Sequence, residues 1–259
     1  MWNEIRARIK QGYRTAPFPG KEMKLPERYL GAPALDRKKC EDPGCGRCMK
    51  ACPVSCISRT SKTFSLDLGI CIFCGECAKV CPSGAITFTR HYAMAANHRS
   101  DLRLEGRTLK LAKELEDKSK KIFGHSLKLR QVSAGGCNAC EADTNVLNTL
   151  AWDLGRFGIQ FVASPRHADG LLITGPITQN MLLALRKTYD AVAEPKIVVV
   201  VGACAISGGI YRNHEETNNG ADGNILPVDL YIPGCPPHPA TILDGLLRLL
   251  GRIDTGARH

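Results

Sequence analysis

The sequence predicts two folded modules in one chain: a small α+β module near the N-terminus, then a doubly wound α/β domain with a mostly parallel sheet. Two observations predict this order. Residues 45–58 and 74–87 repeat one pattern position for position, which indicates two half-modules related by pseudo-symmetry. From Leu127 onward, short apolar runs alternate with helical patterns, as is typical of strands and helices in a parallel sheet.

Cysteine content is the most unusual feature of the composition. The chain has 259 residues, of which 44% are hydrophobic, so it can bury an ordinary core. Nine of its 13 cysteines lie between Cys40 and Cys81, and the other four lie between Cys137 and Cys235. A disulfide scaffold would need an oxidising compartment and a chain with too little core. Metal binding in a reducing cytosol therefore fits the clustering better.

Targeting and charge point the same way. The N-terminus is charged from Glu4 onward and lacks the apolar run of a secretory signal, so we expect a cytoplasmic protein. The run from Ile197 to Ile206 is short and contains Gly202, so it predicts a buried strand and any membrane link must be peripheral. The formal charge is +10, but twelve thiolates holding three clusters would reduce it to about +4. Much of the basicity then balances the clusters.

Residues 1–35 predict a short helix followed by an extended arm. Apolar side chains recur at helical spacing near the start, at Trp2, Ile5, Ile9 and Tyr13. Arginines and lysines flank them, so this basic amphipathic helix suits a membrane surface, a partner subunit or its own domain. Four prolines between residues 15 and 35 forbid a continuing helix. We expect the arm to lie along a partner.

The repeat lies within residues 36–90, and a short strand or hairpin is expected between its halves, at 63–68. Residues 91–126 are polar and charged, and they predict a helical connector between the two modules. Its helix is expected near 104–123, where leucines stand at positions 109, 111 and 115.

Residues 127–252 form the predicted α/β domain. The first strand is expected at 127–132, followed by a helix with apolar residues from Val146 to Phe157 on one face. Another helix is expected near 179–193, and further strands at 159–163, 170–174, 197–201 and 228–232. Functional loops of such sheets follow the carboxyl ends of strands. The cysteine loops should therefore converge on one edge.

The cysteine spacing predicts 4Fe-4S clusters. A cluster needs four thiolates, and C-x2-C-x2-C places three of them on one tight loop. A further cysteine, which follows after three intervening residues and precedes proline, ligates the other cluster of a two-cluster ferredoxin. The second half-module fits without deviation, with Cys71, Cys74, Cys77 and Cys81-Pro82. In the first half, position 42 is Asp and the nearest upstream cysteine is Cys40. A two-residue insertion containing Pro43 and Gly44 repairs the pattern.

We therefore predict a ferredoxin-like module with two clusters. One is assigned to Cys40, Cys45, Cys48 and Cys81. The other is assigned to Cys71, Cys74, Cys77 and Cys52. Cys56 aligns with Ala85 in the repeat, so it is interpreted as a packing thiol, with a ligand role as the minor alternative. Structural zinc sites do not use this triple followed by Cys-Pro, and few aromatics accompany the basic residues, so a nucleic-acid-binding zinc protein is disfavoured.

The last four cysteines predict a third 4Fe-4S cluster, held by Cys137, Cys140, Cys204 and Cys235. Their long-range spacing alone is weak evidence. Glycine or proline stands beside each of these cysteine loops, which lets the backbone approach a cluster and direct N–H groups at its sulfurs. Glu141, next to Cys140, suits either proton transfer at an interface with another protein chain or an ordinary acid at a helix N-terminus.

The loops of this domain resemble a known superfamily. The relevant segments are ITGPIT at 173–178, EPKIVVVVGACAISGG at 194–209 and VDLYIPGCPPHP at 228–239. They are similar to the small subunits of NiFe hydrogenases and to the homologous complex I subunit that carries the last cluster before quinone. The resemblance covers residues 127–250 and implies a flavodoxin-like fold. The N-terminal part, including PFPGKEMKLPERYLG at 17–31, resembles the two-cluster ferredoxin-like subunit of the same assemblies.

The resemblance also implies a branch. Complex I homologues have two adjacent cysteines at the first ligand position, whereas Cys137 and Cys140 are separated as in hydrogenases. The sequence shows neither the twin-arginine signal nor the C-terminal extension of uptake-type subunits. The implied branch is the membrane-bound, energy-converting type, such as formate hydrogenlyase, with an equivalent subunit of a complex I-like or NiFe-lacking oxidoreductase as the alternative.

The resemblance also implies the role of this chain. The chain would be an oxidoreductase subunit with no substrate-converting site of its own, relaying electrons to or from a NiFe centre held by a large subunit. The implied partners are that large subunit or its complex I-like homologue, membrane subunits, and soluble ferredoxin or a formate- or CO-oxidising donor, but no nucleic acid. We expect the complex on the cytoplasmic side of the membrane.

Overall fold

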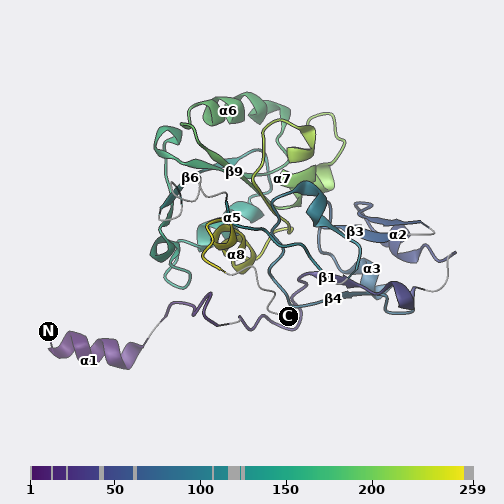
Figure 1. Cartoon of the computed structure of the whole chain (residues 1–259), viewed down its shortest axis with the longest axis horizontal. Coiled ribbons are helices and arrows are strands. Elements are labelled where there is room, and N and C mark those ends of the chain that lie inside the picture. Colours follow the sequence, from purple (N-terminus) through teal and green to yellow (C-terminus); the bar gives the residue numbers. More distant parts are fainter. Residues whose placement is uncertain are drawn as a thin grey trace.

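The structure, a computed structural model, describes residues 2–12, 14–21, 23–40, 44–60, 63–106, 108–115, 123 and 126–253. A rounded α/β body carries the smaller cysteine-rich module on one side, and the N-terminal helix α1 (Trp2–Gln11) projects away from both (Figure 1). Within the described residues, no helix combines the length and apolar character needed to cross a bilayer.

A five-stranded parallel sheet forms the centre of the α/β body. Its strands lie in the order β10-β9-β8-β6-β7, and all the pairings between them are parallel. Counted along the chain and read from the β7 edge, this is the 2-1-3-4-5 order of flavodoxin-like folds, as the resemblance implied. The strands are β6 (Leu127–Ser133), β7 (Ile159–Phe161), β8 (Gly170–Thr174), β9 (Ile197–Val201) and β10 (Leu230–Ile232). Every residue of β8 and β9 is buried, because helices or the small module cover both faces.

Helices cover the two faces of this sheet. Helix α6 (Gln179–Asp190) lies on one side, and α5 (Ala139–Val146) and α8 (Pro239–Leu249) lie on the other (Figure 1). The short α7 (Ala203–Ser207) follows β9. All residues of α8 are buried, and its leucines pack with Leu127, Leu172 and Val199 from one sheet face. Short 3-10 turns complete the domain, namely η3 (Leu154–Phe157), η4 (Pro165–His167), η5 (Gly209–Tyr211) and η6 (Gly220–Gly223).

The small module consists of short antiparallel strands and two short helices. Strand β1 (Pro33–Leu35) pairs with β4 (Ile86–Phe88). Strand β3 (Phe64–Asp67) pairs with both β2 (Ile57–Arg59) and β5 (Arg103–Leu104). The helices are α2 (Arg47–Ala51) and α3 (Glu76–Lys79), and the 3-10 turns are η1 (Arg37–Lys39) and η2 (Arg99–Leu102). One continuous apolar cluster joins this module to the nearer face of the large sheet, through residues such as Leu66 and Ile206.

Two predicted helices differ from the structure. The helix expected through Phe157 ends at Val146, because tight turns follow it and Asp153 adopts a left-handed backbone with φ 48°. Leu150, expected on the buried face, is 84% exposed. In the connector, residues 108–115 are not helical, because their backbone pairs with distant partners: Ala112 N donates to Ala95 O and Leu115 N to Leu249 O. The rest of that expected helix, 116–122, lies outside the described residues.

The arm that follows α1 packs against the α/β domain of its own chain, which corrects the expectation of a partner. Phe18 is 4% exposed and contacts the rings of Tyr92 and Trp152. The Arg156 guanidinium donates hydrogen bonds of 2.9 Å to the carbonyl oxygens of Ala16 and Phe18. The buried Phe18 ring and the two hydrogen bonds from Arg156 fix this arm to the α/β domain.

Candidate iron-sulfur sites

The four C-terminal cysteines stand at the carboxyl end of the parallel sheet. Cys137 and Cys140 follow β6, Cys204 lies in α7 directly after β9, and Cys235 follows β10. Parallel strands bring such loops to one edge, where flavodoxin-like folds bind their ligands. The loops contact one another here: Gly202 N donates to Ile232 O, and Ala203 N donates to Gly234 O, both at 2.8 Å. The edge predicted from the sequence therefore forms.

These four thiols lie close enough to influence one another electrostatically. Burial and the negative charges of Cys235 and Cys137 raise the pKa of Cys204 to about 11. Burial, followed by the charges of Cys204, Glu141, Cys235 and Cys137, also raises the pKa of Cys140. The raised pKa values of Cys140, Cys204 and Cys235 show that these thiols resist ionisation, and a positively charged iron-sulfur core would stabilise their thiolates.

Two glycines let the backbone fit against these sulfurs. Gly202 has φ +92°, and a Cβ there would lie 2.5 Å from the Sγ of Cys140. A Cβ at Gly209, which has φ +54°, would lie 2.8 Å from the Sγ of Cys204. A residue with a side chain is disfavoured at both positions, because the backbone has a positive φ and because the added Cβ would collide with a cysteine sulfur. Gly202 and Gly209 thus leave room for the cysteine sulfurs beside the backbone.

Glu141 is a buried carboxylate beside this set. It is 6% exposed in α5, and its Oε1 accepts hydrogen bonds of 2.6 Å from the hydroxyls of Ser133 and Thr174. These two partners come from β6 and β8 and were not recognised in the sequence, because nothing in local spacing links positions so far apart. The hydroxyls hold the carboxylate in one orientation without neutralising it.

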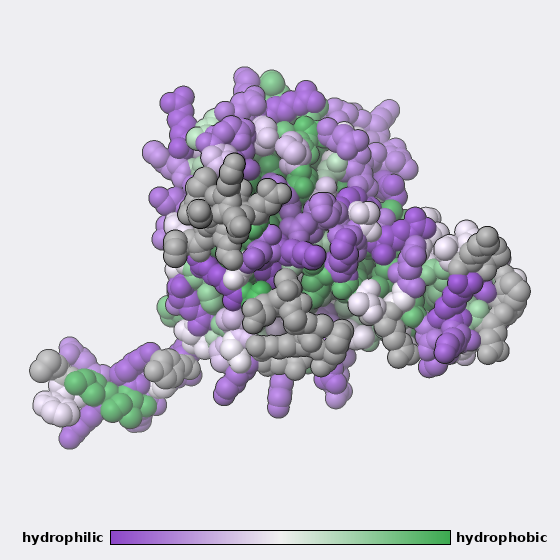
Figure 2. All heavy atoms as spheres, viewed as in Figure 1, coloured by the Kyte–Doolittle hydropathy of each residue, from purple (hydrophilic) through white to green (hydrophobic). Residues whose placement is uncertain are grey.

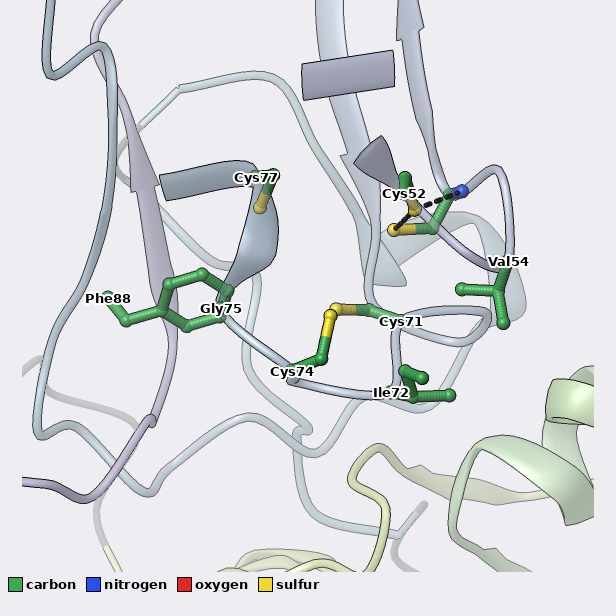
Figure 3. Close-up of a pocket in the computed structure, with 9 residues that line it drawn as sticks. Cys52, Val54, Cys71, Ile72, Cys74, Gly75, Cys77 and Phe88 are labelled. Atoms are coloured by element: carbon green, nitrogen blue, oxygen red, sulfur yellow. Dashed lines mark hydrogen bonds between the residues drawn. The ribbon is translucent and has the colours of Figure 1, made fainter. Parts of the chain in front are cut away.

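The second set of thiols surrounds a hollow in the small module (Figure 3). Its lining includes Cys52, Cys71, Cys74 and Cys77, and its volume is about 250 Å³ including the open mouth. Cys77 comes from α3, and Cys52 immediately follows α2. Burial and the charges of Cys71, Cys74 and Cys52 raise the pKa of Cys77 to about 12. The structure therefore brings together all four cysteines of this predicted set.

Cys56 also reaches this hollow. It is 6% exposed, and its sulfur lies 3.4 Å from that of Cys52. A hydrogen bond with Cys71 is the main cause that lowers the pKa of Cys71 and raises that of Cys56. The Cys56 thiol therefore holds its proton more tightly than the Cys71 thiol does. The packing role of Cys56 stays a prediction, with a ligand role as the alternative.

The first set is Cys40, Cys45, Cys48 and Cys81. Burial is the main cause that raises the pKa of Cys48, and the charges of Cys40 and Cys81 contribute. The Arg59 guanidinium donates hydrogen bonds of 3.2 Å to the carbonyl oxygens of both Cys40 and Cys45. It therefore ties together the two ends of the wide loop. Residues 41–43, including the Pro43 expected in that loop, lie outside the described residues.

The two half-modules repeat their sulfur contacts as well as their sequence. Cys56 N donates to the Sγ of Cys52 at 3.3 Å, and Ala85 N donates to the Sγ of Cys81 at 3.2 Å. In each half, the cysteine of the Cys-Pro pair thus receives the N–H four residues later. Backbone N–H groups aimed at sulfur stabilise thiolates and tune cluster potentials.

The second and third sets lie next to each other. Burial and the charge of Cys137, then that of Cys71, raise the pKa of Cys235. Cys71 belongs to the small module and Cys235 to the α/β domain, so this influence crosses the boundary between them. Within the described residues, no three Cys, His, Asp or Glu side chains meet at the spacing of a single-ion site. All 13 cysteines are free thiols.

Comparisons with known protein families agree with both sites. The model of the family described as "NADH ubiquinone oxidoreductase, 20 Kd subunit" matches residues 137–249, which include the four C-terminal cysteines. The model of a 4Fe-4S binding domain matches residues 64–87, which include Cys71, Cys74, Cys77 and Cys81. The chain thus carries 4Fe-4S binding sequence in the small module and the 20 kDa subunit family in the large domain.

Three curated relatives extend this result. The chain is 40% identical over 133 residues to the probable membrane-bound hydrogenase subunit mbhJ of Pyrococcus furiosus, covering 51% of this chain and 79% of that one. Formate hydrogenlyase subunit 7 of Escherichia coli is 44% identical over 124 residues, covering 48% of each chain. An NADH-quinone oxidoreductase subunit of Phocaeicola vulgatus is 42% identical over 117 residues, covering 45% of this chain and 59% of that one.

All three relatives are named as subunits, and the chain spans only about half the length of the formate hydrogenlyase one. The match to the Pyrococcus protein extends over most of that relative, and the matching family model includes all four cysteines at the sheet edge. The chain belongs to the family of the NADH ubiquinone oxidoreductase 20 kDa subunit.

Proposed function

We propose that this chain is the electron-transfer subunit of a membrane-associated, energy-converting NiFe hydrogenase complex of the formate hydrogenlyase type. It relays electrons through three 4Fe-4S clusters to or from a NiFe site in a partner large subunit, and it converts no substrate itself. The twelve assigned cysteines hold the clusters, in the three sets given above. When bound, the clusters supply one-electron redox chemistry.

One observation carries the proposal: the loop that leads to Cys71 of the second set packs against the helix that carries Cys204 of the third set, where the Ser207 hydroxyl donates to Gly69 O at 2.8 Å. The small module holds the first two sets, which exchange their Cys-Pro cysteines, and Cys71 of the second set acts electrostatically on Cys235 of the third. Electron transfer between clusters falls off steeply with distance, so a relay needs such adjacency. The order is then the Cys40 set, the Cys71 set and the Cys137 set.

The residues around the third set suit a large subunit. Cys137 and Cys235 are exposed, and so are Ile210 and Tyr211, at 56% and 41%, on the turn that follows Cys204. The backbone of Ile210 hydrogen-bonds Cys204, so this apolar turn adjoins the cluster. Apolar and aromatic side chains beside a redox centre are typical of a protein interface. We assign the NiFe-bearing partner to this face.

Helix α1 supports a peripheral membrane location. Trp2 and Ile9 are 74% and 76% exposed, and none of the helix is buried. Figure 2 shows the isoleucine surface on this projecting helix beside hydrophilic side chains. On a helical projection Arg6 and Lys10 flank one edge of the apolar stripe and Arg8 the other, as in helices that lie in the headgroup region. We assign α1 to the membrane, on its cytoplasmic side.

The proposal is tested by isolating the chain with its native partners and identifying them. A hydrogenase predicts a large subunit with four nickel-binding cysteines, hydrogen evolution, and about twelve irons in this chain. An assembly that evolves no hydrogen and whose large subunit lacks those cysteines would support the complex I-like alternative, which the similarity to the NADH-quinone oxidoreductase subunit of Phocaeicola vulgatus favours. Zinc in place of iron would exclude both.

A further inference from the structure

An arginine outside the cysteine motifs joins the two modules. Arg99 opens η2, and its Nη1 and Nη2 donate hydrogen bonds of 2.8 and 2.9 Å to the two carboxylate oxygens of Asp67. Its Nε and Nη2 donate to the carboxylate of Asp222 at 2.8 and 3.3 Å. Asp67 ends β3 in the small module, whereas Asp222 lies in η6 of the α/β domain. One guanidinium thus forms two bidentate pairs, one within the small module and one across the boundary to the α/β domain.

Asp67 in turn organises the loop that leads to Cys71. Its side chain accepts a hydrogen bond from Gly69 N at 2.8 Å, and its carbonyl accepts one from Cys71 N at 3.0 Å. The Asp67 backbone N–H donates to Cys56 O at 2.8 Å. A shift of Asp67 would therefore move the first cysteine of the second set.

The same loop is pressed against the helix that carries Cys204. The buried Ser207 hydroxyl, in α7, donates to Gly69 O at 2.8 Å. A Cβ at Gly69 would lie 2.8 Å from the Arg99 guanidinium carbon and 2.8 Å from a methyl of Ile206, so the loop has no spare room there. The side chains of Arg99, Asp67 and Asp222 are 23–25% exposed, which leaves these charged pairs only partly screened by water.

We propose that Arg99 is a positioning residue that sets the spacing between the second and third cluster sites. This inference rests on the proposed electron relay. Lysine cannot replace Arg99, because a single ammonium cannot form two bidentate pairs. Loss of these charge-assisted bonds would let the Cys71 loop shift against α7, so electron transfer between the two sites should slow several-fold.

Arg103 offers a matched control. Its guanidinium donates to the hydroxyls of Ser65 and Ser58 at 3.1 Å, so it ties strands within the small module and does not cross the boundary. Asp222→Asn offers a second variant. It removes the carboxylate of the α/β domain that pairs with Arg99, and it keeps the Arg99–Asp67 pair beside the Cys71 loop.

The test uses the anaerobically reconstituted full chain. Iron content is measured first, then magnetic coupling between the reduced second and third clusters by electron paramagnetic resonance, then the rate of electron transfer between them after rapid photoreduction. R99Q, R99K and D222N should keep their iron, but their magnetic coupling should weaken and electron transfer should slow several-fold, while R103Q matches the wild type. If R99Q loses iron, the test of the role of Arg99 rests on the coupling and the rate of the D222N chain.

Two results would overturn the role of Arg99: full coupling and rate in an iron-loaded D222N or R99Q chain, or an equal change in R103Q. A wild-type chain that takes up no iron would instead refute the proposed relay and this inference together. The iron measurement thus separates an error in the role of Arg99 from an error in the proposed electron relay.

Discussion

At the scale of single residues, Cys52 and Cys56 pose the sharpest question of assignment. Their sulfurs lie 3.4 Å apart, and both line the hollow of the second set. Only Cys52 has a counterpart in the repeat that precedes proline, whereas Cys56 aligns with Ala85. Position in the repeat favours Cys52 as the ligand, and the hydrogen bond with Cys71 raises the pKa of Cys56, which disfavours its thiolate.

Alanine substitution separates the two roles. Cys56→Ala places in the first half the residue that the second half already has, so the chain should keep all its iron. Cys52→Ala should lose about four of twelve irons, because a cluster needs its fourth thiolate. Iron and protein analysis after anaerobic reconstitution measures both variants. Loss only in C56A would show that the assignment is reversed, and equal iron in the two variants would show that the two cysteines do not differ in role.

The sequence predicted the cysteines better than their surroundings. Spacing alone grouped Cys71, Cys74 and Cys77, because a C-x2-C-x2-C loop places three thiolates around one cluster. Arg59, Ser133 and Arg99 escaped notice, since each acts on partners 8 to 123 positions away through contacts that only the fold creates. An arginine gives no local sign of what it will bridge.

At the scale of elements, local composition decided which predictions succeeded. Strands β8 and β9 begin and end where predicted, because continuous apolar runs bounded by polar residues leave little choice. In the connector, residues 108–115 are not helical, although the leucines at 109, 111 and 115 have helical spacing. The structure instead uses that segment to extend along the α/β body, with its N–H groups on Ala95 and Leu249. Tertiary partners overrode local periodicity.

Helix α8 carries a buried ion pair within the core. Asp244 and Arg248 are 3% and 6% exposed, and Arg248 Nε donates to Asp244 Oδ2 at 2.7 Å. Burial raises the pKa of Asp244, although the guanidinium opposes that shift. Arg248→Met should cost about 3–5 kcal/mol of unfolding free energy, because it leaves a buried carboxylate without its guanidinium. The double variant D244L/R248M should recover most of that loss.

Urea unfolding at two pH values tests this pair. The raised pKa means that the folded chain binds the Asp244 proton more tightly than the unfolded chain, so stability from this group falls as pH rises above its ordinary pKa. The deficit of R248M should therefore be smaller at about pH 5 than at about pH 8. Lys79→Met breaks an exposed pair with Glu76 and should change little. A deficit independent of pH would contradict the mechanism.

Helix α1 gives the second prediction for an element. Replacing Ile5 and Ile9 with serine removes apolar surface worth about 1.5–3 kcal/mol each when fully buried, so membrane binding should weaken at least about tenfold. Co-sedimentation of the assembled complex with anionic vesicles measures it. Leu183→Ser, at a 63% exposed position on α6, is the matched control. Equal loss in both variants, or binding indifferent to lipid charge and salt, would argue that α1 contacts another protein.

At the scale of the whole molecule, two modules of unequal stability share one core. The α/β body has a five-stranded parallel sheet and a fully buried helix, and it can bury a large apolar area without metal. The small module has strands of two to four residues, and the lining of its hollow is largely cysteine. Its iron should therefore supply a larger share of its folding free energy.

We expect iron removal to unfold the small module before the α/β domain. After the clusters are oxidised and chelated anaerobically, residues 36–90 should become sensitive to protease while 127–252 stay protected, because only the larger domain retains a sufficient apolar core. Mass spectrometry of the fragments locates the cuts, and the iron-loaded chain is the control. Cuts spread equally over both domains would mean that the third cluster also holds the sheet edge together. The two modules would then depend on metal to the same extent, despite their different cores.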